Sequence, residues 1–465
     1  MKAILLEEVK NVLRAELKTP LRKGRITRVT TDSRQVKAGD LFVALRGERF
    51  DGHDFIDAAV RAGAQAVLID RNVPLSEEVK QTGVVVMQVE DTVQALGALA
   101  RFYRRNLCGS VNVVAVTGTN GKTTVREMIY HVLSRFKKGH RSPRNYNNNI
   151  GVPLTIFGIE AEHDFAVVEI GTNAPGEVAT LSRIAEPDIA VITRVGPSHL
   201  DGLKDIEGVS VEKVSIVVGL KEHGVLVCGV GHPPTLERAE SLGRHVIKFG
   251  LDTKCDVYAE KIERDKGGVR FVTNDRCEVR LGILGVHNVN NALAALAVVR
   301  RLGITSEQFS EAMKDFKPAK GRMDCREVNG ITVIDDSYNA NPVSMTAALE
   351  ELVNFPQAKR RVFVVGDMYE LGEKSEQFHR ELGRDIAGEG IELLLTVGPK
   401  GAQVAESALE AGMGRGSIMR CKNSKRMARL IKSMLYDGDV VLVKGSRAME
   451  MENVIVSLDR WKGRT

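Results

Sequence analysis

The chain has 465 residues, of which 43% are hydrophobic and 27% are charged, and its formal net charge is +6 at pH 7. This composition is ordinary for a globular protein and leaves room for about two to four domains. The small net charge gives no sign of a nucleic-acid partner, and no stretch approaches the roughly 20 apolar residues of a membrane span.

The first predicted domain spans residues 1–106. Short strand-like runs, such as DLFVAL at residues 40–45, alternate with helical stretches such as residues 53–64. This alternation predicts an α/β domain.

The second predicted domain spans residues 107–318. It opens with the continuous apolar run VNVVAV at residues 111–116, which is typical of a parallel strand covered on both faces. Similar runs follow at residues 165–170 and 189–195. We therefore expect a parallel sheet, with a small antiparallel meander over residues 255–283.

A candidate phosphate-binding loop, VTGTNGKTT, lies at residues 116–124. Val116 stands where the usual pattern G-x-x-x-x-G-K-[ST] has its first glycine. Lys122 would offer its charge to the β- and γ-phosphates, and the Thr123 hydroxyl would bind Mg²⁺. A capped strand–turn–helix without a ligand is the alternative. The residues predicted to cradle the phosphates are Gly118, Thr119, Asn120, Gly121, Lys122, Thr123 and Thr124.

Three further polar residues follow later apolar runs of this domain. Glu169 ends a predicted strand, where a carboxylate is either a Mg²⁺ ligand or a solvated strand end. His199 lies in a loop, where a single histidine is more often structural than catalytic. From spacing alone, Lys213 is typical of a surface lysine on a helix.

The third predicted domain spans residues 319–465. Apolar runs at residues 331–336, 361–367, 392–398 and 439–445 are separated by helical segments. The pattern predicts a second, Rossmann-like α/β domain.

Taken together, these motifs resemble the Mur ligases, the ATP-dependent amide ligases of peptidoglycan precursor synthesis. The resemblance covers nearly the whole chain, and GTNGKTT is this family's own short form of the phosphate loop. It implies that Glu169 and His199 help to hold magnesium, and that Lys213 is carbamylated to N6-carboxylysine. It also implies ATP as co-substrate and two magnesium ions, one of them beside Thr123.

The resemblance assigns further residues around the nucleotide. Asn288 and Asn291, in GVHNVNNALAA at residues 285–295, look like adenine-side contacts; a polar cap on an alanine-rich helix is the alternative. Arg322 is expected to reach an ATP phosphate from the third domain, and Asp336 is expected near the ribose. The residues expected to act in catalysis are Lys122, Glu169, His199, Lys213 and Arg322.

The substrate side is implied by motifs in the first and third domains. The turn TDSR would contact the uridine nucleotide of UDP-N-acetylmuramoyl-tripeptide through Thr31, Asp32, Ser33 and Arg34. The segments DDSYNANP, GDMYELGEKSEQFH and KGSRAMEME resemble the members that add D-Ala-D-Ala, with Tyr338, Asn339 and Asn341 on the substrate side. The alternative is the preceding step, which adds a diamino acid to the dipeptide-stage substrate.

Two other classes share part of this pattern. Folylpolyglutamate synthase has the central chemistry but lacks the N-terminal module, and a P-loop switch protein would leave Arg322 without a role. Glu373 and His379 are candidates for the general base. Six scattered cysteines without a C-x-x-C pair favour a cytoplasmic protein with reduced thiols. We expect a monomer that acts on small molecules and closes its domains around them.

Overall fold

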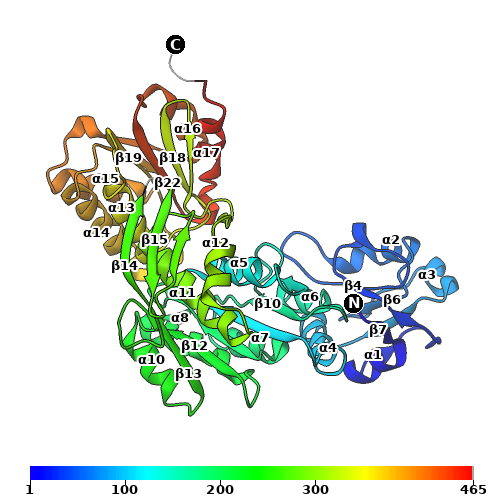
Figure 1. Cartoon of the computed structure of the whole chain (residues 1–465). Helices are drawn as coiled ribbons and strands as arrows, with labels where there is room; N and C mark the ends of the chain where they lie inside the picture. The colour runs from blue at the N-terminus through cyan, green and yellow to red at the C-terminus, as the bar shows by residue number, and fades with distance from the viewer. Residues whose placement is uncertain (266, 463–465) are drawn as a thin grey trace.

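The computed structural model describes residues 1–265 and 267–462. Three large sheets follow one another along the chain, and each belongs to one lobe in Figure 1. The blue N-terminal lobe extends to one side of the central lobe, and the yellow-to-red C-terminal lobe lies above the central lobe in this view. The predicted domain boundaries near residues 106 and 318 stay a prediction.

The N-terminal lobe contains a five-stranded sheet in the order β2-β7-β6-β5-β4. All of its pairs are parallel except β2 with β7. Every residue of β5 and β6 is buried, because helices such as α2 and α4 cover the faces of the sheet. The bounds are β2 (Glu16–Leu17), β4 (Arg28–Thr30), β5 (Asp40–Val43), β6 (Ala66–Ile69), β7 (Val85–Gln88), α2 (Ile56–Arg61) and α4 (Thr92–Leu107).

The central lobe is built on a nine-stranded sheet in the order β16-β15-β14-β13-β12-β11-β8-β10-β9. The strands from β9 to β14 in this order pair in parallel, and β14, β15 and β16 form the predicted antiparallel meander. The meander continues the parallel sheet, and only two residue pairs join β13 to β14 at the junction. Such a short junction leaves no signal in the sequence, so the sequence did not indicate that the two parts form one sheet. The bounds are β8 (Asn112–Thr117), β9 (Gly139–Arg141), β10 (Phe165–Glu169), β11 (Ile189–Ile192), β12 (Val225–Gly229), β13 (His245–Gly250), β14 (Val257–Asp265), β15 (Gly268–Thr273) and β16 (Glu278–Leu281).

The C-terminal lobe contains a six-stranded sheet in the order β17-β18-β22-β19-β20-β21. Its strands pair in parallel, except for the hairpin of β17 and β18. The register places Asp336 opposite Lys444 at the carboxyl ends of β18 and β22, where open α/β sheets bind their ligands. The bounds are β17 (Asp324–Val328), β18 (Ile331–Asp336), β19 (Arg360–Gly366), β20 (Leu393–Val397), β21 (Ile418–Cys421) and β22 (Asp439–Lys444).

Three helices carry candidate site residues in or just before their first turns. Helix α5 (Lys122–Leu133) follows β8 directly and packs against α11 (Val286–Arg301). Helix α13 (Pro342–Val353) begins after the loop that leaves β18. Among the described residues, no helix is both long and apolar enough to cross a membrane.

Candidate active site

The phosphate loop connects β8 to α5 and is shaped by two glycines with positive φ. Gly118 has φ 141° and Gly121 has φ 90°. A Cβ atom on Gly121 would lie 2.3 Å from Asn291 Oδ1, and one on Gly118 would lie 2.0 Å from Thr193 Oγ1. Only glycine fits at these positions, because any other side chain would collide with the floor of the cleft.

Lys122 folds over its own loop. Its Nζ donates hydrogen bonds to the carbonyl oxygens of Gly118, at 2.8 Å, and of Thr119, at 3.1 Å. The pKa of Lys122 is lowered to about 8 by burial, which outweighs the opposing charge of Glu169, and by the positive charge of Arg322. Among the described residues, no carboxylate forms an ion pair with this ammonium, so a bound phosphate would supply its anionic partner.

Glu169 lies at the end of β10, only 3% exposed. Thr123 Oγ1 donates to its Oε2 at 3.0 Å, and Asn147 Nδ2 donates to its Oε1 at 3.0 Å. Thr123 and Glu169 thus place a hydroxyl and a carboxylate side by side, which are oxygen ligands of the kind Mg²⁺ takes.

Arg126 is a functional candidate that the sequence did not indicate. Its Nη1 lies 3.0 Å from Glu169 Oε2, and both side chains are 3% exposed. The guanidinium also donates to the carbonyl oxygen of Arg144, at 2.6 Å. Arg126 therefore balances the charge of Glu169 when no metal does. Arg126 lies on the buried face of α5, and no motif in the sequence marks it.

His199 precedes the short helix α8 (Leu200–Leu203) and reaches the cleft from the central lobe. Two adjoining cavities, of about 520 and 650 Å³, are both lined by Lys122, His199 and Arg322. The structure thus brings His199 to the phosphate loop, and its Nδ1 lies 2.5 Å from Glu370 Oε2 of the C-terminal lobe.

Lys213 lies on α9 (Ile206–Val214) and is 1% exposed, so the surface-lysine alternative is wrong. Burial lowers its pKa well below the usual value, and the nearby charge of Lys122 acts in the same direction. Its neighbour Glu212 already accepts hydrogen bonds from the amides of Gly176 and Val178, at 2.7 and 2.8 Å. In the part of the chain that the structure describes, no carboxylate forms an ion pair with the Lys213 ammonium.

The described residues contain no group of three or more His, Cys, Asp or Glu side chains that could hold a metal ion. A carbamate on Lys213 would add an anionic oxygen ligand, which suits the buried and unpaired amine found there.

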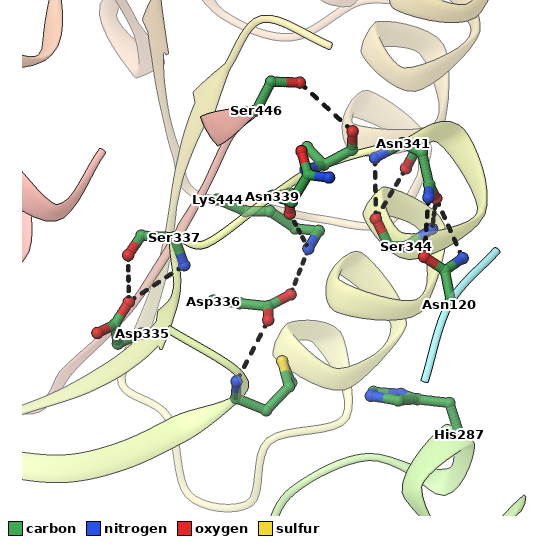
Figure 2. A network of polar contacts seen from close by, with 12 residues as sticks. Asn120, His287, Asp335, Asp336, Ser337, Asn339, Asn341, Ser344, Lys444 and Ser446 are labelled. Carbon is green, nitrogen blue, oxygen red and sulfur yellow. Dashed lines mark hydrogen bonds and ion pairs between the residues drawn. The ribbon is translucent and has the colours of Figure 1, made fainter. Parts of the chain in front are cut away.

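A polar network in the C-terminal lobe surrounds Asp336 (Figure 2). Asp336 Oδ2 lies 2.5 Å from Lys444 Nζ, and its Oδ1 accepts a hydrogen bond from the Met323 amide at 3.2 Å. Lys444 Nζ also donates to the carbonyl oxygen of Asn339, at 2.9 Å. Asp336 and Lys444 line a small cavity together with Arg322 and Asn291, so the two lobes meet there.

The adenine-side candidates lie in the first turns of α11. Asn288 Nδ2 donates to the carbonyl oxygen of Leu284 at 2.6 Å, and Asn291 Nδ2 donates to Asn288 Oδ1 at 2.8 Å. His287 lines the same cavity, although sequence reasoning did not single it out from the motif that contains it. Burial lowers the pKa of His287 to about 4, so it presents a neutral ring to the cavity (Figure 2).

Asn341 joins the two lobes directly. Its Nδ2 donates to Asn120 Oδ1 at 2.8 Å, and Asn120 Nδ2 donates to Asn341 Oδ1 at 3.2 Å (Figure 2). Asn341 Oδ1 also caps α13 by accepting from the Ser344 amide. In this arrangement Asn341 docks the C-terminal lobe onto the phosphate loop, and its contact with substrate stays a prediction.

Tyr338 lies between two arginines. The guanidinium of Arg322 is 4.2 Å from the ring centroid and that of Arg447 is 5.8 Å from it. Arg447 and Asn339 both line the cavities of about 520 and 650 Å³. Arg447 lies in the KGSRAMEME segment, but it was not singled out from that motif. It brings a further cation, paired at the surface with Glu452, to the cleft.

Neither candidate for a general base is among the described residues that line the two cavities shared by Lys122 and His199. His379 is buried; its Nδ1 contacts the carbonyl oxygen of Ser375 at 2.6 Å, and its Nε2 accepts from the Met368 amide at 3.0 Å. Both ring nitrogens are thus engaged in the C-terminal lobe. Glu373 is exposed on the turn before α14 (Ser375–Gly388).

The TDSR turn lies on the N-terminal lobe directly after β4, apart from the cleft formed by the other predicted residues. Asp32 accepts from the Arg34 amide and from the Arg34 guanidinium, which lowers the pKa of Asp32 to about 2. Arg34 is 86% exposed, so its cation is available to an anionic ligand. Thr31 and Ser33 complete this turn.

Comparison with known proteins covers all three lobes. Residues 25–104 match the Mur ligase family, catalytic domain; residues 116–299 match the Mur ligase middle domain; and residues 321–447 match the Mur ligase, glutamate ligase domain. A Bacillus subtilis protein named UDP-N-acetylmuramoyl-tripeptide–D-alanyl-D-alanine ligase is 37% identical over 432 residues, which are 92% of each chain.

Two solved structures share the whole architecture. A crystal structure of MurF from Acinetobacter baumannii superposes with a TM-score of 0.89 at 31% identity, covering 99% of this chain and 100% of the other. A structure of MurF ligase from Thermotoga maritima in complex with ADP superposes with a TM-score of 0.82 at 31% identity, covering 93% and 97%.

Proposed function

The chain belongs to the Mur ligase family, and from this premise we propose that it joins D-alanyl-D-alanine to UDP-N-acetylmuramoyl-tripeptide at the expense of ATP. The observation that carries the proposal is the full-length similarity to ligases of that name, such as the Bacillus subtilis protein matched over 92% of its length. The products are ADP, phosphate and UDP-N-acetylmuramoyl-pentapeptide.

The chemistry requires an activated carboxylate, because an amine does not displace oxygen from a carboxylate ion. The terminal carboxylate oxygen of the tripeptide attacks the γ-phosphorus of ATP, and ADP leaves. The amine of D-Ala-D-Ala then attacks the acyl phosphate and gives up a proton. The tetrahedral intermediate collapses to the amide and inorganic phosphate.

Phosphoryl transfer is helped mainly by positioning and by charge neutralisation. Lys122 would leave the carbonyl oxygens of its loop and bind a phosphate oxygen. The phosphate would give the buried ammonium an anionic partner. Arg322 reaches the same cavities from the C-terminal lobe, so it approaches the phosphates only when the lobes are closed. Asp336 and the neutral His287 ring would line the nucleoside side.

Magnesium, when bound, would neutralise phosphate charge and help to align the reacting oxygens. Thr123 and Glu169 are the residues that would hold one ion. His199 and a carbamylated Lys213 would hold the second.

The environment of Lys213 suits carbamylation. Its low pKa keeps a share of the amine neutral, and a neutral amine attacks CO₂, forms an N–C bond and releases a proton. The resulting carbamate is an anion that a metal ion can balance in a buried place.

The dipeptide has a carboxylate at its C-terminus and needs a cation that it can reach from the cavities. Lys444 is buried against Asp336, whereas the side chain of Arg447, which pairs with Glu452 at the surface, is 62% exposed. We assign Arg447 to the dipeptide carboxylate, with Tyr338 and Asn339 beside it.

Phosphate release tests the proposal. The full chain is given ATP, Mg²⁺ and UDP-N-acetylmuramoyl-tripeptide, with either D-Ala-D-Ala or a free diamino acid. We expect release only with D-Ala-D-Ala. Release with the dipeptide-stage substrate and a diamino acid, but not with the tripeptide and D-Ala-D-Ala, would move the enzyme to the preceding step and overturn the proposal.

A further inference from the structure

Glu370 of the C-terminal lobe meets His199 of the central lobe across the cleft. The distance from Glu370 Oε2 to His199 Nδ1 is 2.5 Å. Beside it, the Leu200 amide donates a hydrogen bond to the carbonyl oxygen of Glu370 at 2.9 Å. Side chain and backbone together thus fix one glutamate of one lobe against one histidine of the other.

Both residues have backbone conformations that side chains other than glycine seldom take. His199 has φ 52° and Glu370 has φ 61°. Left-handed residues of this kind persist where the surrounding structure holds them, and they gather at functional sites. Because both contacting residues take this conformation, the backbone of each lobe holds its side chain in the position that makes the contact.

The segment that carries Glu370 is anchored in the C-terminal lobe. The Met368 amide donates to Nε2 of the buried His379 at 3.0 Å, and the Tyr369 amide donates to Ser446 Oγ at 2.9 Å. The position of Glu370 is therefore set by the core of its own lobe, and the carboxylate reaches His199 only while that lobe is docked.

The chemistry of the pair is that of a metal-binding histidine and its supporting carboxylate. A histidine that binds a metal through one ring nitrogen almost always gives its other N–H to a carboxylate, carbonyl or water, which fixes the ring. Within the described part of the chain, His199 Nδ1 has no well-directed hydrogen bond despite the short contact, and the Glu370 carboxylate is its charged neighbour there.

We propose that Glu370 is a positioning residue that orients the His199 ring toward the second magnesium site, and does so only when the C-terminal lobe is closed. This inference rests on the proposed function, because His199 is a metal ligand only within it. Closure and binding of the second metal are then linked, so each favours the other to the same degree.

The test is Mn²⁺ binding, followed by electron paramagnetic resonance, to the full chain with UDP-N-acetylmuramoyl-tripeptide and a non-hydrolysable ATP analogue. We expect Glu370→Ala to weaken the second Mn²⁺ by about 10-fold or more, the range for partners that support metal ligands. Affinity for the ATP analogue should fall by less than affinity for the second Mn²⁺. The matched control is Glu376→Gln, which removes an exposed charge on the next helix and should bind both ions normally.

A double-mutant cycle separates positioning from docking of the lobes. In a His199→Ala background, Glu370→Ala should cause no further loss of Mn²⁺ affinity, because its effect passes through the histidine. An equal loss in both backgrounds, or an equal loss of ATP-analogue affinity, would overturn the inference. Binding of a single Mn²⁺ by the wild type would also overturn it, and normal phosphate release with D-Ala-D-Ala by that same protein would leave the proposed function standing.

Discussion

Replacing Arg126 with methionine should destabilise the central lobe and make its stability depend on magnesium. Arg126 and Glu169 form an ion pair at 3.0 Å with both side chains 3% exposed. Removing one partner of a buried pair leaves an uncompensated charge and costs about 3–5 kcal/mol. We expect the low end, about 3 kcal/mol, because Thr123 and Asn147 still donate to the Glu169 carboxylate.

Thermal unfolding measures this effect. A loss of about 3 kcal/mol corresponds to a fall in Tm of roughly 6–12 °C for a domain of this size, at about 2–4 °C per kcal/mol. Magnesium with an ATP analogue should stabilise Arg126→Met more than the wild type, because the metal replaces the missing cation beside Glu169. The matched control is Arg135→Met, which breaks the exposed pair with Asp315 and should change stability by less than about 1 kcal/mol.

Two results would refute the reasoning. A fall in Tm no larger than that of Arg135→Met would mean that Glu169 does not need a buried cation. Equal stabilisation of variant and wild type by magnesium and the ATP analogue would mean that the metal does not come near Glu169.

Other predictions concern single steps. ATP affinity, measured by calorimetry, should be constant below pH 8 and fall as the pH rises through the Lys122 pKa of about 8, because the ammonium is lost; Lys122→Met should remove this pH dependence, and its persistence would contradict the assignment. Ligase activity should fall in CO₂-free buffer and return with bicarbonate, except in Lys213→Ala, whereas indifference of the wild type would argue against carbamylation. Asn341→Ala should give a more open enzyme by small-angle scattering, since it removes both hydrogen bonds between the side-chain amides of Asn341 and Asn120. Arg447→Ala should raise KM for D-Ala-D-Ala and leave KM for ATP unchanged; an equal rise in both would refute a role in dipeptide recognition.

The parts of the fold with strong local patterns were predictable from the sequence. The apolar strand, glycine-containing loop and helix over residues 112–133 form a continuous local signal, and the structure contains β8 and α5 there. Lys122 and His199 follow the parallel strands β8 and β11, so their meeting at shared cavities could be expected from strand ends. Arg322 precedes β17, and its place there was expected only from the family resemblance.

The rest of the site depends on contacts between distant segments. Lys213 has the local sequence of a surface lysine, and only the packing of α9 against neighbouring helices buries it. The pairs Arg126 with Glu169 and His199 with Glu370 join segments that no local pattern connects. A single sequence carries no signal for such pairs, because many arginines and glutamates occur in similar local settings.

Mass spectrometry of the products tests the central claim most directly. The substrate is UDP-N-acetylmuramoyl-tripeptide with ¹⁸O in its terminal carboxylate, incubated with the full chain, ATP, Mg²⁺ and D-Ala-D-Ala. We predict UDP-N-acetylmuramoyl-pentapeptide together with inorganic phosphate that has gained an ¹⁸O atom from the carboxylate. Phosphate without ¹⁸O, or ADP formation without the pentapeptide product, would contradict an amide ligase that acts through an acyl phosphate.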